Sequence, residues 1–200
     1  MQYYNPHFLF CTFFGLGKFF KRFPGTIGSL IAVPLAYFVT WFSLLILNFF
    51  PAYSDLYIAR FFAPVCTLAI LFFIGVYSSS KYSAQIKVED PKEVIIDEII
   101  AQMLCMVLSL PLTFNLISQN LAGKTVIYYD VVFILAILGN FVLFRFFDIV
   151  KPWPISWVDK KIHGGFGIMF DDIVAAIFAL VIYFAVLFSI IDFYVGRTGA

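Results

Sequence analysis

The chain has 200 residues, of which 62% are hydrophobic, 20% aromatic and only 12% charged, and its mean hydropathy is +0.97. This composition excludes an ordinary soluble domain, in which about 25% of the residues are charged. The formal net charge of +1, with no basic block apart from acidic neighbours, offers no electrostatic surface for nucleic acid. We therefore expect residues 1–200 to form a single membrane-embedded domain.

The first 25 residues lack the basic start and small-residue cleavage site of a secretory signal, so we expect them to stay on the protein. Five apolar segments of roughly 17 to 25 residues follow, and they lie at 27–50, 61–77, 94–117, 131–147 and 173–191. Continuous apolar runs exclude the alternating pattern of a membrane barrel. The predicted fold class is therefore all-α, a polytopic bundle of about five spanning helices. Pro34 and Pro111 predict a kink or local break in the first and third spans.

The loops between these segments carry Lys and Arg unequally. If the N-terminus is cytoplasmic, the opposite side holds only Arg60, Lys124 and Arg197, and the cytoplasmic side holds Lys18, Lys21, Arg22, Lys81, Lys87, Lys92, Arg145, Lys151, Lys160 and Lys161. Because positive residues stay inside, we predict a cytoplasmic N-terminus and an external C-terminus. The same topology places Asp55, Asp130 and Asp192 outside and gathers the other acidic residues at the cytoplasmic rim.

Asp97 and Glu98 interrupt an apolar run that otherwise continues into the membrane. Ionisable residues in such positions usually face a protein interior or a partner charge. Adjacent helical residues point about 100° apart, so we expect one of the two to bind a metal and the other to orient a neighbour. An equally weighted alternative is that both are solvated at the start of a helix, where acids are favoured.

Asp171 and Asp172 repeat this arrangement at the start of the fifth span, after a glycine-rich stretch. Taken alone, this pair is better explained by helix capping, since Asp is a preferred N-cap and glycines form turns. Together with Asp148, however, the two acidic pairs lie at one membrane depth. Convergent carboxylates are the hard oxygen ligands that Mg²⁺ or Mn²⁺ prefers. We therefore predict a divalent metal site at this rim.

Positive groups lie beside the predicted carboxylate cluster. Arg145 and Lys151 are placed to bind phosphate, and the helix start at Gly25–Gly28 offers backbone N–H groups to an anion. For Lys160 and Lys161, anchoring to the membrane surface is an equally good explanation. Tryptophans and prolines between positions 152 and 157 indicate a segment at the depth of lipid headgroups.

Four polar motifs occur in order: PGTIGSL at Pro24–Leu30, IDEI at Ile96–Ile99, FRFFDIVKPWPI at Phe144–Ile155 and GGFGIMFDDIVAA at Gly164–Ala176. This set closely resembles the phosphatidylglycerophosphatase A family of bacterial membrane enzymes, over most of the chain. The resemblance implies a Mg²⁺-dependent phosphatase of phospholipid biosynthesis in the cytoplasmic (inner) membrane. Its substrate would be phosphatidylglycerol phosphate, and its active site would face the cytoplasm.

The resemblance also implies roles for individual residues. The expected catalytic and metal-binding residues are Asp97, Glu98, Asp148, Asp171 and Asp172, and the expected substrate-binding residues are Thr26, Ser29, Arg145, Lys151 and Gly165. We favour metal-assisted hydrolysis, in which one carboxylate accepts the proton of the attacking water. An aspartyl-phosphate intermediate is an open variant. The sequence does not determine the oligomeric state.

Two other functions compete with the enzyme. A small divalent-cation transporter would carry polar residues near the bilayer midplane, often at broken helices. In this chain the predicted carboxylates lie at one rim, and Pro34 and Pro111 have no charged neighbours. A non-enzymatic membrane scaffold would use the rim charges only to fix its topology. The combined motifs favour the enzyme over both alternatives.

Overall fold

The computed structural model describes residues 5–54, 56–121 and 129–197, and in these ranges all regular elements are helices. The helices long and apolar enough to cross a membrane are α3 (Pro24–Leu47), α5 (Tyr57–Ile86), α6 (Ile96–Leu121), α7 (Tyr129–Val150) and α9 (Gly164–Arg197). The shorter helices are α1 (Pro6–Cys11), α2 (Leu16–Phe19), α4 (Pro51–Ser54) and α8 (Ile155–Lys161). The all-α prediction and the span count are therefore confirmed.

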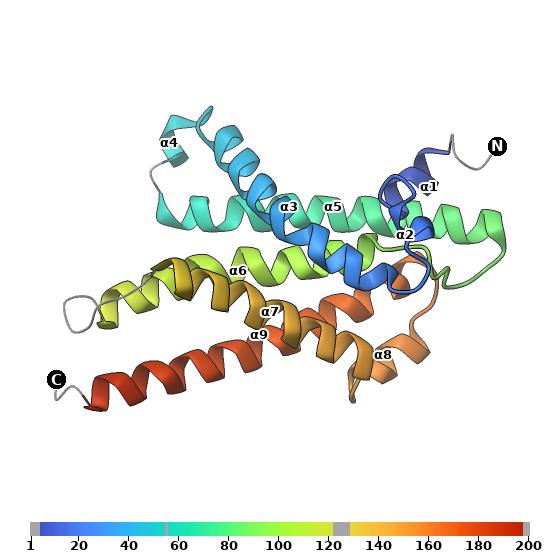
Figure 1. Ribbon diagram of the computed structural model, residues 1–200. Helices are drawn as coiled ribbons and strands as arrows, with labels where there is room; N and C mark the ends of the chain where they lie inside the picture. The colour runs from blue at the N-terminus through green and yellow to red at the C-terminus, as the bar shows by residue number, and fades with distance from the viewer. Residues whose placement is uncertain (1–4, 55, 122–128, 198–200) are drawn as a thin grey trace.

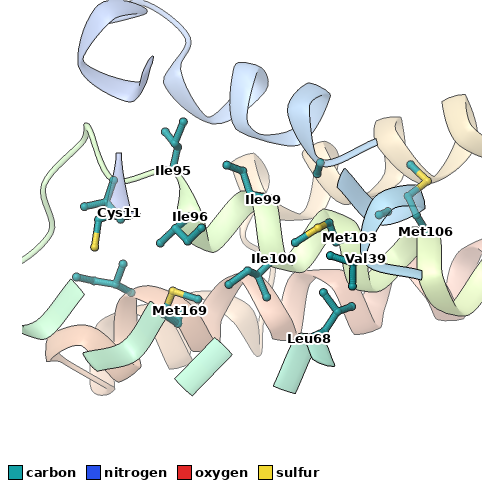
Figure 2. Close-up of a cluster of buried hydrophobic side chains, with 14 of the residues drawn as sticks. Cys11, Val39, Leu68, Ile95, Ile96, Ile99, Ile100, Met103, Met106 and Met169 are labelled. Carbon is teal, nitrogen blue, oxygen red and sulfur yellow. The ribbon is translucent and has the colours of Figure 1, made fainter. Parts of the chain in front are cut away.

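Helix α6 is the central helix of the bundle. It packs against α3, α5, α7 and α9, and 56% of its most apolar stretch is buried, compared with 17–33% for the other spanning helices. Figure 2 shows side chains of α6 meeting Leu68 of α5, Val39 of α3 and Met169 of α9 in one apolar cluster. The packing of α6 at the centre of the bundle therefore fixes the position of its first turn, which contains Asp97 and Glu98.

Small residues let the neighbouring helices approach α6 closely. The buried face of α3 carries mainly Gly, Ala and Ser, and a Cβ atom added to Gly28 would lie 3.1 Å from the carbonyl oxygen of Ile95. On α6, Ala101 is fully buried beside Ala175 and Ala176 of α9. Close contact through small side chains is a common way for helices to associate in lipid, where the hydrophobic effect between helices is absent.

The prolines do not interrupt the spanning helices. Pro34 lies inside α3 and Pro111 inside α6, as does Pro64 inside α5, and each helix continues through its proline. The expected local breaks are therefore wrong. A proline removes one backbone donor, and with little competing water the adjacent turns keep their hydrogen bonds.

The polar ends of the helices gather at one end of the bundle. Figure 1 shows α3, α6 and α9 beginning there, α5 and α7 ending there, and α1, α2 and α8 beside them. Arg60, Asp130 and Asp192 lie near the helix ends at the opposite end. Asp55 and Lys124, which the sequence also assigns to that side, lie outside the described residues, and the side chain of Arg197 is not described.

The glycine-rich stretch before the fifth span is helical, although the sequence predicted a turn. Helix α9 begins at Gly164, which has a φ of +73°. A Cβ atom added to Gly165 would overlap the carbonyl oxygen of Val76 and lie 2.5 Å from the backbone nitrogen of Ser80. Gly165 therefore lets α9 pack directly against the backbone of α5.

Replacing Gly165 with Ala should destabilise the protein, because the clash is with backbone atoms that no side-chain rotation can relieve. We expect a loss of about 1–3 kcal/mol in the free energy of unfolding. Gly139→Ala is the matched control, since its Cβ would meet only the Tyr183 ring at an ordinary 3.6 Å, and Ala favours a helix by up to about 1 kcal/mol. Thermal unfolding in detergent measures both, and equal midpoints would contradict this packing.

Candidate active site

A cavity of about 700 Å³ opens at the polar end of the bundle. The sequence assigned nine acidic residues to this side, and eight of them line the cavity: Glu89, Asp90, Asp97, Glu98, Asp148, Asp159, Asp171 and Asp172. The ninth, Glu93, accepts a hydrogen bond of 2.9 Å from the Tyr82 hydroxyl. The basic lining residues are Lys21, Arg22, Lys92, Arg145 and Lys151. The cavity wall therefore carries more acidic than basic residues.

Three carboxylates converge in this cavity. One oxygen each from Asp97, Glu98 and Asp172 lies within 4.8 Å of the others. Asp97 and Glu98 stand in the first turn of α6, and Asp172 projects from α9, which packs against α6. We call these three residues the carboxylate cluster.

Both acidic residues at the start of α6 reach the same point. The family resemblance named both as metal-binding residues, whereas the angle between adjacent helical residues favoured only one. The longer side chain of Glu98 compensates for the different direction in which it leaves the helix. The N–H of Glu98 also donates to Asp97 Oδ1 at 3.0 Å. Within the described residues, Glu98 Oε2 and Asp172 Oδ2 are buried without a hydrogen-bond partner.

Arg145 brings positive charge close to the carboxylate cluster. Its Nη1 donates to Asp148 Oδ2 at 2.5 Å. A Cβ atom added to Gly25 would overlap Glu98 Oε1 and lie 2.9 Å from Arg145 Nη1. The missing side chain at Gly25 therefore leaves room for both charged groups against the first turn of α3. Asp148 faces this arginine and is not one of the three converging carboxylates.

Lys151 connects the end of α7 to α8 and α9. It follows α7 in a left-handed conformation, with a φ of +43°. Its Nζ donates to Asp159 of α8 at 2.6 Å and to Asp171 of α9 at 2.5 Å. Burial alone would lower the pKa of Lys151, but the hydrogen bonds to the two carboxylates outweigh it and raise the pKa. Asp171 is therefore held by an ion pair with Lys151 and is not one of the three converging carboxylates.

Asp171 and Asp172 do not cap α9. The helix begins at Gly164, so both residues lie about two turns inside it, and both are buried. The capping alternative is wrong because the helix starts earlier than the apolar run. The spacing of the apolar residues alone placed the start of the span at 173.

The first turn of α3 forms one wall of the cavity, where Gly25 and Thr26 line it. The N–H groups at the start of a helix have no carbonyl partner inside the helix, and Phe23, at the N-cap, makes no side-chain cap. These donors and Arg145 can bind an anion beside the carboxylate cluster.

Two of the predicted substrate-binding residues lie away from the cavity wall. Ser29 is buried one turn further along α3, and its hydroxyl donates to the carbonyl oxygen of Gly25 at 3.0 Å. Gly165 packs against α5. Neither is among the residues that line the cavity. Ser29 is therefore buried with a hydrogen bond inside its own helix, and Gly165 meets the backbone of α5.

Several lining residues were not singled out from the sequence. Lys21, Arg22 and Lys92 line the cavity, whereas Lys160 and Lys161 do not. At the rim, His163 Nδ1 lies 3.2 Å from Glu89 Oε1. Lys21 and Arg22 stand one residue before the Pro-Gly start of α3, and this position is a signal that could have identified them.

The carboxylate cluster has the donor set of a hard divalent cation. Carboxylate oxygens are the preferred protein ligands of Mg²⁺, Mn²⁺ and Ca²⁺. Two of the three side chains offer a buried oxygen that has no partner among the described residues. Mutual repulsion and burial both oppose such an arrangement unless a cation compensates it. The residues therefore fit a Mg²⁺ ion.

Comparisons with known proteins agree with the motifs. Residues 9–187 match the family described as Phosphatidylglycerophosphatase A. Phosphatidylglycerophosphatase A of Haemophilus influenzae is 32% identical over 182 residues, which cover 91% of this chain and 89% of the relative. The Escherichia coli protein of the same name is 33% identical over 181 residues, which cover 90% of this chain and 83% of the relative.

A relative from Bacteroides thetaiotaomicron is 28% identical over 170 residues, which cover 84% of this chain and 86% of the relative. It carries the provisional name phosphatidylinositol-3-phosphatase. No solved structure matches the chain.

Repulsion within the carboxylate cluster predicts that Asp172→Asn stabilises the protein when divalent cations are chelated. Removing one buried charge should raise the unfolding midpoint in EDTA by about 2–4 °C for each kcal/mol of repulsion that is relieved. Asp192→Asn, which changes an exposed residue at the opposite end, should leave the midpoint unchanged. Differential scanning fluorimetry in detergent measures both. A lower midpoint for Asp172→Asn in EDTA would show that the cluster is not under electrostatic strain.

Proposed function

The chain belongs to the phosphatidylglycerophosphatase A family, and from this membership we propose that it hydrolyses phosphatidylglycerol phosphate to phosphatidylglycerol and inorganic phosphate. The observation that carries the proposal is the carboxylate cluster beside an arginine and a helix N-terminus, in one cavity at the end of the membrane helices. A metal-binding group next to an anion-binding group suits a phosphate monoester. The position at the bundle end suits a substrate whose headgroup stays at the membrane surface.

Asp97, Glu98 and Asp172 would hold Mg²⁺, because their oxygens converge and two are buried without a partner among the described residues. When bound, Mg²⁺ polarises the phosphoryl group and lowers the pKa of a bound water. The carboxylates also orient the attacking water, and one of them accepts its proton. The new bond forms between the water oxygen and phosphorus, the bond from phosphorus to the glycerol oxygen breaks, and the proton passes to the departing alkoxide.

Arg145 and the first turn of α3 would hold the oxygens of the transferred phosphate. Negative charge on these oxygens is balanced by the guanidinium and by the N–H groups of Gly25 and Thr26. Asp148 fixes the guanidinium through its 2.5 Å contact. Lys151 holds α8 and α9 in place through Asp159 and Asp171, and so keeps Asp172 directed at the cluster.

The protein would lie in the bacterial cytoplasmic membrane with its cavity facing the cytoplasm. The positive-inside distribution supports this orientation, and the relatives from Haemophilus influenzae and Escherichia coli are bacterial. Trp153 and Trp157 are exposed at the same end of the bundle as the cavity, as expected for side chains at headgroup depth. The transporter alternative is less favoured, because the carboxylate cluster includes the first turn of α6 and lies near one end of the bundle.

A second candidate substrate comes from the name of the Bacteroides thetaiotaomicron relative. Phosphatidylinositol 3-phosphate also carries a phosphate monoester on a diacylglycerol phosphodiester headgroup. We favour phosphatidylglycerol phosphate because the relatives with this activity in their names share 32% and 33% identity with the chain. Measuring kcat/KM for both lipids on the purified protein decides between them.

Asp97→Asn should reduce phosphate release from phosphatidylglycerol phosphate by about 10²-fold or more, since the cluster would lose a metal-binding charge. EDTA should abolish release by the wild type, and Mg²⁺ should restore it. Mg²⁺ should also raise the unfolding midpoint of the wild type more than that of the variant. Asp130→Asn, at the opposite end of the bundle, is the control. Full activity of Asp97→Asn, or release that persists in EDTA, would refute the metal-assisted mechanism.

The proposed orientation predicts which face of the membrane a cysteine occupies. His163 is exposed at the cavity rim and Asp192 at the opposite end, so His163→Cys should react with an impermeant thiol reagent only in inverted vesicles. Asp192→Cys should react in intact cells. Both variants are made with Cys66→Ala, because Cys66 is exposed whereas Cys11 and Cys105 are buried. Labelling of His163→Cys in intact cells would show that the predicted topology is wrong.

A further inference from the structure

A second hollow adjoins the cavity of the carboxylate cluster. It has a volume of about 390 Å³ and is lined by Phe19, Phe20, Lys21, Arg22, Phe23 and Ile27. Lys21, Arg22 and Phe23 line both hollows. A polar cavity and an aromatic groove are therefore contiguous, and two positive side chains stand at the boundary between them.

The order of these surfaces matches the order of groups in the proposed substrate, and the inference rests on that proposed function. Phosphatidylglycerol phosphate carries a terminal phosphate monoester, then a phosphodiester, then a diacylglycerol. We propose that Lys21 and Arg22 bind the phosphodiester while the monoester lies at the carboxylate cluster. The groove beside them, formed by Phe19, Phe20 and Phe23, then receives the diacylglycerol part.

The charges in the cavity support this assignment. The two cations nearest the cluster are already paired, Arg145 with Asp148 and Lys151 with Asp159 and Asp171. Among the residues that the structure describes, Lys21 and Arg22 have no carboxylate partner within 4.0 Å, so they are available to an anion from outside. Lys92 also lines the polar cavity but does not border the groove. Lys21 and Arg22 differ from Lys92 because they lie between the polar cavity and the groove.

The groove has the surface of a lipid contact. Phe19 is 78% exposed and Phe23 is 62% exposed. In a water-soluble protein, phenylalanine side chains are usually buried. The guanidinium of Arg22 lies 5.7 Å from the centre of the Phe23 ring, a contact that limits its freedom. The segment thus presents aromatic rings to lipid and holds a positive group beside them, at the mouth of the polar cavity.

The double variant Lys21→Gln/Arg22→Gln tests the phosphodiester assignment. In mixed micelles with varied mole fractions of phosphatidylglycerol phosphate, KM should rise about ten- to hundredfold while kcat changes little, because two charge-assisted contacts to the substrate are lost. The inhibition constant of inorganic phosphate, which probes only the monoester position, should stay within about twofold of wild type. Lys81→Gln/Lys87→Asn, which alters exposed residues at the same end but outside both hollows, should leave both constants unchanged.

The outcomes separate this inference from the proposed function. An unchanged KM would overturn the phosphodiester assignment. An inhibition constant of inorganic phosphate that rises as much as KM would also overturn it, because Lys21 and Arg22 would then bind the monoester or only stabilise the fold. Membrane anchoring does not enter the measurement, because the protein and the substrate share the same micelle. If wild-type protein released no phosphate from this lipid, the proposed function itself would fail.

A second variant tests the groove. Phe19→Ala/Phe20→Ala should lower kcat/KM about tenfold for a long-chain substrate, since apolar contact with the acyl part is lost. The same variant should change kcat/KM for a dihexanoyl substrate by less than about threefold. An equal loss for both chain lengths would mean that the groove does not bind the acyl part of the lipid.

Discussion

The site depends on holding three carboxylates together at the end of a packed helix bundle. Oxygens of Asp97, Glu98 and Asp172 lie within 4.8 Å of one another, and like charges at such distances repel strongly in a poorly hydrated site. Small residues bring α6 against its neighbours, and the missing side chain at Gly25 leaves space for Glu98 and Arg145. The packing of the bundle opposes the repulsion, and the proposed Mg²⁺ ion would balance it.

The basic residues around this cluster divide into two groups. Arg145 and Lys151 are paired with acidic residues and fix the ends of α7, α8 and α9. Lys21 and Arg22 stand further out, between the polar cavity and an aromatic groove. The inner pair therefore maintains the geometry of the site, and in the proposed mechanism Arg145 also contacts the transferred phosphate. The outer pair has no carboxylate partner among the described residues, and we propose that it recognises the rest of the lipid headgroup. Under the proposed function, this division would let one cavity hold a cation at its base and an anionic lipid at its mouth.

Much of the fold could be predicted from the sequence because lipid imposes strict rules on it. Long apolar runs must be helices, so the five spans and the all-α class followed from hydropathy. The loop charges predicted that most acidic residues share one end, and the structure brings eight of them to one cavity. The four polar motifs also indicated the family before any geometry was known. Residue chemistry and hydropathy along the chain therefore determined the fold class and the place of the site.

Only the tertiary structure decided which side chains meet. Hydropathy does not locate the start of a helix beyond its apolar run, so it missed that α9 begins at Gly164 and that Asp172 lies inside the helix. The rotation of each helix about its axis depends on packing, which buries Ser29 and turns Gly165 toward α5 and Asp172 toward α6. Lys21 and Arg22 reach the cavity because α2 and the turn after it place them beside α3. The contacts of α9 with α5 and α6 join segments far apart in the chain, and no local pattern specifies them.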